Sequence, residues 1–379
     1  MKRIAILQAG GPTQVLNASL AGFVNTAKQF SQLVFVQGGY EGLAKGDFYE
    51  ADEKKLAWVQ AHRGVPGACL ASGRFPLNEQ ALQQSLHHLK EKCIDTVVGI
   101  GGNGTMAALQ KLSSYAAKDG MSLQVAGIPK TVDNDIGCTD HAPGFGSAAR
   151  YVAASVRDMS RDLLAMKNFE KIRILETMGR HTGWLAAASG LLRDYEEEGP
   201  HFIGLPEVRT DPDELCGIVS NALSKHGCAL LVVSEGMLWD KTSPVARAEV
   251  NGRQMLGGVS QAIAEYLGET LNVNGVRSEL LGMNQRSLSL AVSDIDRKEA
   301  YEVGEQCASF IESEKTGFMV SILRQDSYTY TTTLKAVPLQ RVAEYGEQCL
   351  PARFITHHEE YSDWLRPLVG EGLKSYPAP

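Results

Sequence analysis

The stretch Arg3-Ile4-Ala5-Ile6-Leu7-Gln8-Ala9-Gly10-Gly11 places an apolar run directly before two glycines. Short apolar runs that end near glycine recur along the chain, and segments with helical spacing follow several of them. This alternation is typical of parallel strands that helices cover on both faces. The predicted strands span residues 3–7, 96–100, 124–128, 171–175, 229–234 and 277–283, and the predicted helices span residues 15–28, 105–117, 147–162, 183–192 and 258–267.

The size of the chain favours two lobes rather than one. Its 379 residues are 44% hydrophobic and 21% charged, an ordinary composition for a globular protein but a length above that of one typical domain. We therefore predict an α/β fold of two Rossmann-like three-layer lobes, with mainly parallel sheets and a cleft between them.

Charge and composition exclude several classes of protein. The net charge of −7 argues against nucleic-acid binding, which normally needs a basic face. No apolar stretch approaches the ~20 residues that a membrane-spanning helix requires. Seven cysteines without a C-x-x-C pair indicate neither a disulfide framework nor a zinc cluster, so a reduced, cytoplasmic location is expected.

Three strand-to-helix turns carry the residues that could bind a ligand or take part in catalysis. They are Gly10-Gly11, then Gly101-Gly102-Asn103-Gly104-Thr105, and then the segment from Lys130 to Asp135. In open α/β sheets, ligands bind beyond the carboxyl ends of strands, where backbone N–H groups of the next helix face an anion. Glycines let the main chain approach phosphate oxygens, and Thr105 can add a hydroxyl. Together the turns predict a polyphosphate site.

Simpler explanations exist for each turn. Paired glycines can be tight-turn chemistry alone. Residues 99–104 also match the G-x-G-x-x-G pattern of NAD-binding oxidoreductases, but the acidic residue expected on the following strand is replaced by Ile128-Pro129-Lys130. No Walker-type phosphate loop is present either.

The third turn is the most specific of the three. In an extended segment Asp133 and Asp135 would share one face, with Asn134 on the other. One carboxylate could then take a proton from an attacking hydroxyl while the other holds Mg²⁺. The alternative is a surface turn rich in Asx residues.

Six segments, taken together and in order, resemble the phosphofructokinase family, in particular its diphosphate-using bacterial branches. They are QAGGPTQVLNASL, GIGGNGTM, GIPKTVDNDI, DHAPGFGSAARY, ETMGRHTGW and VVSEGM, and the resemblance extends to about Arg286. It implies a donor lobe of residues 1–145 plus roughly 287–350, a sugar-phosphate lobe of residues 146–286, and a C-terminal extension of residues 351–379.

The resemblance also implies roles for individual residues. Asp133 would be the general base, Thr131 would bond the phosphoryl group, and Gly11, Lys130 and Arg74 would complete the catalytic set. The expected donor-binding residues are Gly10, Gly11, Arg74, Gly102, Asn103, Gly104 and Thr105, and the expected metal residues for Mg²⁺ are Asn103 and Asp135. The expected acceptor-binding residues, besides Thr131 and Asp133, are Lys171, Met178, Gly179, Arg180, Glu235, Arg277 and Arg286.

Two residues bear on the identity of the phosphoryl donor, and they favour different donors. Diphosphate-using relatives share Lys130, which can neutralise diphosphate, but they usually carry an Asp that blocks the nucleotide where this chain has Gly104. Lys130 adds an attractive interaction with diphosphate, whereas Gly104 only removes an obstacle to ATP. We therefore predict diphosphate as the donor, with ATP as the alternative.

The acceptor site departs from the family pattern at two positions. Met283 stands where many relatives have His, and Lys171 stands where an Arg commonly reaches across the subunit interface. Arg173, on the same strand face as Lys171, could compensate. Fructose 6-phosphate is the expected acceptor, phosphorylated on its 1-hydroxyl, and another sugar phosphate or polyol is the alternative. The resemblance further implies a homodimer or homotetramer with a shared 6-phosphate pocket.

Three other classes of protein account for the sequence less well. NAD kinases and diacylglycerol-type lipid kinases share the G-G-[DN]-G-T element but do not account for PKTVDND or ETMGRHTGW. A regulatory subunit without activity would be expected to lack Asp133. An NAD-binding oxidoreductase rests on the glycine pattern alone, and no feature indicates a nucleic-acid or membrane partner.

Overall fold

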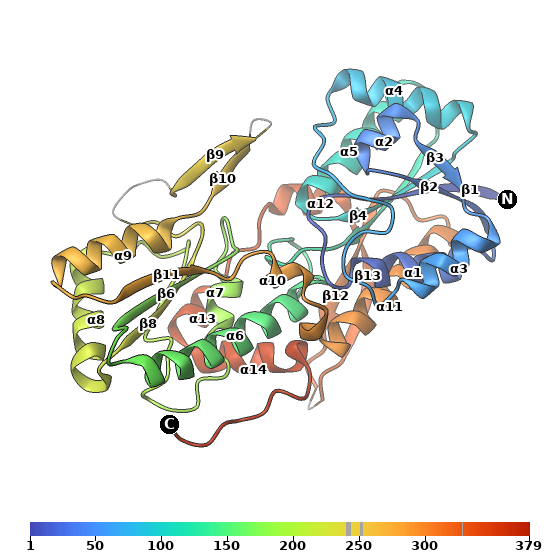
Figure 1. Cartoon of the computed structure of the whole chain (residues 1–379). Helices are drawn as coiled ribbons and strands as arrows, with labels where there is room; N and C mark the ends of the chain where they lie inside the picture. Colours follow the sequence, from blue (N-terminus) through green and yellow to red (C-terminus); the bar gives the residue numbers. More distant parts are fainter. Residues whose placement is uncertain (240–243, 251–252, 328) are drawn as a thin grey trace. The chain divides into compact units, whose positions relative to one another are not determined.

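The computed structural model describes residues 1–239, 244–250, 253–327 and 329–379 (Figure 1). The chain divides into two compact units. The first comprises Met1–Phe145 and Arg286–Gln348, and the second comprises Gly146–Gln285 and Cys349–Pro379. Each is an α/β unit built on a mainly parallel sheet, which confirms the predicted fold class.

The first unit contains a seven-stranded sheet in the order β13-β12-β5-β4-β1-β2-β3. The central pairs from β12 to β2 are parallel, and the two edge strands β13 and β3 are antiparallel to their neighbours. Its strands are β1 (Lys2–Gln8), β2 (Ser31–Val36), β3 (Phe48–Glu50), β4 (Thr96–Gly101), β5 (Gln124–Pro129), β12 (Phe318–Arg324) and β13 (Thr332–Pro338).

Helices cover both faces of this sheet because side chains alternate along each central strand. On β1, Ile4 and Ile6 belong to one core with residues of α1 and α11, and Ala5 and Leu7 belong to another with residues of α4, α5 and α12. The helices of the unit are α1 (Leu16–Ala27), α2 (Tyr40–Lys45), α3 (Glu53–Ala61), α4 (Glu79–Glu91), α5 (Asn103–Lys118), α11 (Asp294–Glu312) and α12 (Leu339–Tyr345).

Helices α1 and α11 approach each other at backbone distance. A Cβ on Gly22 would lie 2.0 Å from the Tyr301 carbonyl oxygen, and one on Gly304 would lie 2.1 Å from that of Ser19. Only glycine fits at these two crossings, so the sequence sets how closely α11 lies under the sheet.

The second unit contains a four-stranded parallel sheet in the order β11-β6-β8-β7. Its strands are β6 (Ile172–Thr177), β7 (Phe202–Gly204), β8 (Ala229–Ser234) and β11 (Val276–Leu280), and an antiparallel hairpin joins β9 (Ala246–Val250) to β10 (Arg253–Leu256). The helices with this unit are α6 (Phe145–Met166), α7 (Trp184–Ala188), α8 (Pro212–His226), α9 (Val259–Thr270), α13 (Ala352–Thr356) and α14 (His358–Val369). The short segments α10 (Asn284–Ser287) and η1 (Ser289–Ala291) follow β11.

The C-terminal residues belong to the second unit. The buried Tyr361 of α14 donates its hydroxyl to the Trp184 carbonyl at 2.5 Å, and the rings of Trp184, Phe354, Tyr361 and Trp364 pack together. Segment 370–379 then runs along α6, where Arg157 donates to the Tyr376 hydroxyl and lies over its ring.

Two predicted elements are shorter than expected. The helix predicted over 183–192 ends at Ala188, because the backbone then tightens into successive turns such as Gly190 N–H to Ala187 C=O. The strand predicted over 277–283 ends at Leu280, and Gly282 adopts a left-handed conformation (φ +63°) that redirects the chain. None of the described helices is both long and apolar enough to span a bilayer.

Candidate functional site

The three predicted phosphate turns lie at one edge of the first unit's sheet. Strands β1, β4 and β5 are parallel neighbours, with Gln8 opposite Ile100 and Gly101 opposite Pro129. Their carboxyl ends therefore meet, which brings together Gly10-Gly11, the start of α5 and Lys130-Thr131. This juxtaposition is what the motif analysis required of a polyphosphate site.

The first turn is enclosed by arginine. The Gly10 N–H donates to the Gly73 carbonyl at 2.9 Å, and the Ser72 hydroxyl donates to the Gly10 carbonyl at 2.6 Å. A Cβ on Gly11 would lie 2.4 Å from Arg286 Nη1 and 3.8 Å from Arg74 Nη2. The glycine thus lets two guanidinium groups approach the main chain, where they can hold phosphoryl oxygens.

Lys130 lies beneath the same turn. Its Nζ donates to the Gly11 carbonyl at 2.6 Å and would lie 3.3 Å from a Cβ on Gly10. The residue is 4% exposed. Burial, followed by the nearby charge of Arg74, lowers the pKa of its ammonium to about 8, against the opposing effect of Asp135 and Asp133. The ammonium is therefore a positive charge held under the turn rather than a side chain that extends into solvent.

The second turn begins α5 and leaves space above it. A Cβ on Gly101 would lie 2.0 Å from the Thr105 hydroxyl, so Thr105 folds back over the end of β4. Gly104, in contrast, is exposed, and a Cβ there would meet nothing within 4 Å. The N-terminus of α5 therefore presents its free N–H groups and its positive dipole end to an open region.

The third turn is bent, and here the expected extended segment is wrong. The chain bends at residues 132–133, and Asn134 adopts a left-handed conformation (φ +52°). Asp133 donates its backbone N–H to Thr131 Oγ1 at 3.1 Å, while Thr131 Oγ1 donates to Asp135 Oδ1 at 2.8 Å. The Asp135 carboxylate and the Asp133 backbone are therefore organised around the Thr131 hydroxyl, and strand alternation does not set their arrangement.

Asn103 completes this arrangement. Its amide nitrogen donates to the Asp135 carbonyl at 2.8 Å and to Asp135 Oδ2 at 3.3 Å. Each oxygen of the Asp135 carboxylate keeps a further lone pair. Mg²⁺ is usually bound by one or two carboxylates together with substrate phosphates, so this residue set fits a magnesium ion carried on a phosphoryl donor.

The predicted sugar residues lie at the carboxyl ends of β6 and β8 in the second unit. Glu235 N–H donates to the Thr177 carbonyl at 2.9 Å, and the Ser234 hydroxyl donates to the Gly179 carbonyl. Gly179 has φ +131°, which only glycine adopts readily. These bonds join Met178-Gly179-Arg180 to Glu235, so the segments that the resemblance assigned to one ligand lie side by side.

The residues of the second unit that were expected near the acceptor's anionic group differ in whether their side chains are already paired within the protein. Arg173 is buried and donates to both oxygens of Glu170 at 2.7 and 2.8 Å, and it also pairs with Asp162 at 2.7 Å. The expectation that Arg173 compensates for Lys171 is therefore wrong, because its guanidinium is committed to carboxylates. Arg277, on the edge strand β11, lies 3.8 Å from Glu170 Oε2 but keeps a half-exposed side chain, and Met283 is 58% exposed.

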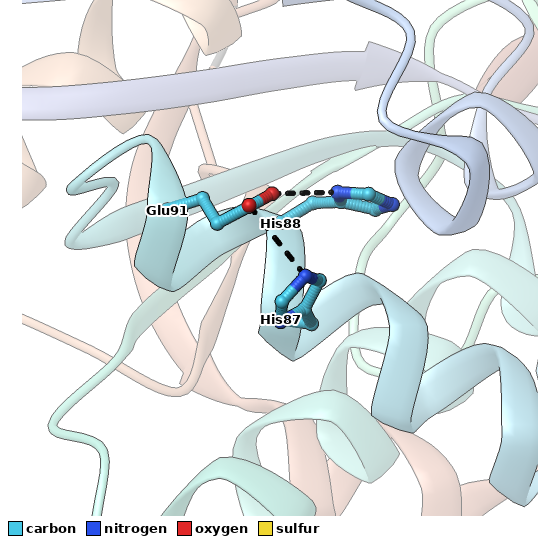
Figure 2. Close-up of side chains that lie close together, drawn as sticks. All are labelled: His87, His88 and Glu91. Atoms are coloured by element: carbon cyan, nitrogen blue, oxygen red, sulfur yellow. Dashed lines mark hydrogen bonds and ion pairs between the residues drawn. The ribbon is translucent and has the colours of Figure 1, made fainter.

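In the part of the chain that the structure describes, one group of side chains has metal-like spacing outside these turns. Figure 2 shows the imidazoles of His87 and His88 on α4 directed at the Glu91 carboxylate, at 3.6 and 3.2 Å. His87 and Glu91 are exposed, and such pairs three and four residues apart are common on helix surfaces. We interpret the group as a surface ion pair.

Two contacts of the site do not follow from the local sequence, although their residues lie in or next to the motif segments. Arg286 lies against Gly11 although the two residues are far apart in the chain. The loop that follows Asp135 is anchored by His141, which contacts Glu299 on α11 at 2.7 Å. Both contacts depend on tertiary packing rather than on motif spacing.

Comparison with known proteins identifies the family. The phosphofructokinase family model matches residues 3–311, somewhat further than the motifs. The chain is 46% identical to a sulfofructose kinase of Alkalicoccus urumqiensis, over 97% of this chain and 95% of that protein. It is 32% identical to a pyrophosphate–fructose 6-phosphate 1-phosphotransferase of Rhodospirillum rubrum, over 98% and 95% of the two chains.

Solved structures agree with this assignment. The pyrophosphate-dependent phosphofructokinase of Marinobacter aquaeolei has a TM-score of 0.87 at 28% identity and covers 100% of this chain and 94% of its own. That of Nitrosospira multiformis has a TM-score of 0.88 at 29% identity, with the same coverage. The oxidoreductase alternative loses its support, since the glycine pattern at 99–104 lies within the match to the phosphofructokinase family model. The chain belongs to the phosphofructokinase family and is a kinase or phosphotransferase.

Proposed function

We propose that the protein phosphorylates the 1-hydroxyl of sulfofructose, a fructose that carries a sulfonate on carbon 6. The observation that carries this proposal is the 46% identity to a sulfofructose kinase along nearly the whole of both chains. The identity to fructose 6-phosphate phosphotransferases is 32% or below. Fructose 6-phosphate, the acceptor expected from the motifs, becomes the competing substrate.

The charge of the acceptor supports this choice. A sulfonate carries one negative charge at neutral pH, whereas a phosphate monoester carries about 1.5 to 2. Met283 contributes no charge where many relatives have His, and Arg173 is neutralised by Glu170 and Asp162. Lys171, Arg277 and Arg286 are then the cations expected at the anion, with Arg277 itself 3.8 Å from Glu170, and such a pocket suits the anion of lower charge. Met178, Gly179, Arg180 and Glu235 would hold the sugar hydroxyls.

The first unit would supply the chemistry. Asp133 would take the proton from the 1-hydroxyl as the oxygen attacks the donor phosphorus. The Gly11 N–H, the Arg74 guanidinium and the Thr131 hydroxyl would hold the transferring group, and Lys130 would add positive charge beneath it. Mg²⁺, held through Asp135 and Asn103, would neutralise charge on the donor phosphates.

The donor that the geometry favours is ATP. The diphosphate interpretation weighed Lys130 as a direct ligand, but its ammonium bonds to the Gly11 carbonyl and is almost fully buried. The space above Gly104 is open, at the position where diphosphate users usually carry the Asp that blocks a nucleotide. Diphosphate is the second candidate, because Arg74, Lys130 and Arg286 place three cations around one turn.

The proposal includes an oligomer. The family resemblance assigns Lys171 and Arg277 to a neighbouring subunit's anion pocket, with Arg286 supplied by the other chain. A homodimer or homotetramer would then be needed for a complete acceptor site.

A product assay tests the function. Purified protein with Mg²⁺ is incubated with sulfofructose or fructose 6-phosphate, each with ATP or diphosphate, and the sugar products are identified by mass spectrometry. We expect a 1-phosphorylated sulfofructose with ATP. Turnover of fructose 6-phosphate alone would overturn the acceptor, and turnover with diphosphate alone would overturn the donor. Asp133→Asn is the control that links any product to this site.

A further inference from the structure

A buried charged cluster lies behind the Asp133 loop in the first unit. Within it, His141 is 2% exposed and stands between two carboxylates. Its Nδ1 lies 2.8 Å from Asp140 Oδ2, and its Nε2 lies 2.7 Å from Glu299 Oε2 on α11. Asp140 and His141 begin the segment DHAPGFGSAARY, but neither they nor Glu299 has a role in the proposed reaction.

The geometry requires a charged imidazole. A neutral ring has one N–H and one lone pair, so one of the two short contacts would set a lone pair against a carboxylate oxygen. Only the imidazolium donates to both. Burial alone would lower the pKa of His141, but Glu299 and Asp140 more than offset it and raise that pKa to about 9.

The other groups that face the cluster keep the imidazolium compensated. The Tyr330 hydroxyl donates to Glu299 Oε1 at 2.6 Å and lies 3.3 Å from His141 Nε2, and the Thr332 hydroxyl lies 3.4 Å from Glu299 Oε1. Arg324 on β12 pairs with Asp140 Oδ2 at 3.3 Å. Burial, and the charge of Glu299 next to it, raise the pKa of Tyr330, so this hydroxyl stays neutral at ordinary pH.

The residues after His141 hold the Asp133 turn directly. The Ala142 N–H donates to Asn134 Oδ1 at 3.1 Å, and the Pro143 carbonyl accepts from Thr131 N–H at 3.1 Å. Two residues that flank Asp133 in the turn are therefore bonded to the two residues that follow His141. A displacement of His141 is transmitted to both sides of the proposed base.

The loop is also fixed on its outer side. Asp140 N–H donates to the Ile322 carbonyl of β12 at 2.8 Å, and Gly144 N–H donates to Asp296 Oδ1 of α11 at 2.8 Å. His141 lies between these two attachments, and its contact with Glu299 joins the middle of the loop to α11. The left-handed Asn134 (φ +52°) is a conformation that needs such support.

We propose that His141, held as an imidazolium between Asp140 and Glu299, is a positioning residue that fixes the Asp133 loop in its active geometry. The inference rests on the proposed role of Asp133. His141 itself touches no reacting atom, and it acts through Ala142 and Pro143.

The pH dependence has a defined sign. A histidine whose pKa is higher in the folded protein than in the unfolded chain contributes fully at pH below about 6.5, and its contribution is lost as the pH rises through about 9. Removing the Glu299 charge moves that loss to lower pH. The ratio of kcat between variant and wild type cancels the titration of Lys130, which both proteins share.

The test measures kcat and KM for Glu299→Gln and wild type between pH 6 and 8.5. We expect a kcat ratio close to one at pH 6 that falls about 10-fold or more by pH 8, with both KM values little changed, since small misplacement of a catalytic group lowers turnover steeply. Thr332→Val keeps both carboxylates and the Tyr330 hydroxyl beside His141, and it is the matched control, with a ratio independent of pH. A pH-independent ratio for Glu299→Gln would overturn the proposal.

Asp140→Asn removes the carboxylate on the other ring nitrogen and should give the same pH-dependent loss if Glu299→Gln does not fold. Hydrogen exchange adds a measurement that needs no turnover. The segment 131–144 should exchange faster in the variant than in wild type at pH 8, with α1 unaffected, and unchanged exchange would contradict the inference. Absence of wild-type turnover would instead refute the proposed function.

Discussion

Replacing Lys130 with Met separates the stability of the protein from its activity. A buried Lys whose pKa falls from 10.5 to about 8 is less stable as an ammonium in the folded protein than in the unfolded chain. At about 1.4 kcal/mol per pKa unit, this corresponds to about 3 kcal/mol at neutral pH. Between pH 8 and 10.5 the unfolded chain binds more protons, so this cost declines and stability rises with pH.

Lys130→Met removes that cost together with the hydrogen bond to the Gly11 carbonyl, which contributes about 1 kcal/mol. The variant should therefore be more stable than wild type by up to about 2 kcal/mol at pH 7. Phosphoryl transfer should nevertheless fall by about 10-fold or more, because positive charge near the transferring group is lost. Denaturant unfolding and steady-state kinetics measure the two effects. A less stable variant with unchanged turnover would refute the assigned charge and position of Lys130.

Two further substitutions and one measurement of assembly test the site. Asp133→Asn should lower kcat by about 10²- to 10⁴-fold with little change in KM, and near-normal turnover would remove Asp133 as the base. Gly104→Asp, which has room for its side chain, should lower kcat/KM for ATP far more than for diphosphate, with Gly104→Ala as the control; equal losses would argue against a nucleotide at this position. Sedimentation at assay concentration should show an oligomer, and a fully active monomer would contradict a shared anion pocket.

The strands that lead directly into a motif turn could be predicted from sequence. The central strands β1, β4, β5, β6 and β8 are short apolar runs near glycine, and each was located to within a residue or two. Helix α4 was not predicted, because only a narrow stripe of Leu82, Leu86 and Leu89 interrupts its polar residues. The predicted strands also lack the largely buried β2 and β12, the edge strands β3, β7 and β13, and the hairpin of β9 and β10, none of which leads into a motif turn.

The parts of the site that could be predicted are those whose residues lie next to one another within a single turn. The three turns converge because parallel strands bring their carboxyl ends to one edge, so Gly11, Asn103 and Thr131 meet as expected. The bend at Asp133 was not predictable, since it depends on the bond from Ala142 to Asn134. The pairing of Arg173 with Glu170 was not predicted, because strand alternation indicates on which face of the sheet a side chain lies but not which residue it contacts.

A competition assay tests the central claim most directly. Equal concentrations of sulfofructose and fructose 6-phosphate are supplied together with limiting ATP and Mg²⁺, and the two 1-phosphorylated products are quantified by mass spectrometry. The product ratio equals the ratio of kcat/KM values, and a difference of about 1.4 kcal/mol in transition-state binding gives a tenfold preference. The account predicts at least this preference for sulfofructose. A tenfold preference for fructose 6-phosphate would contradict it.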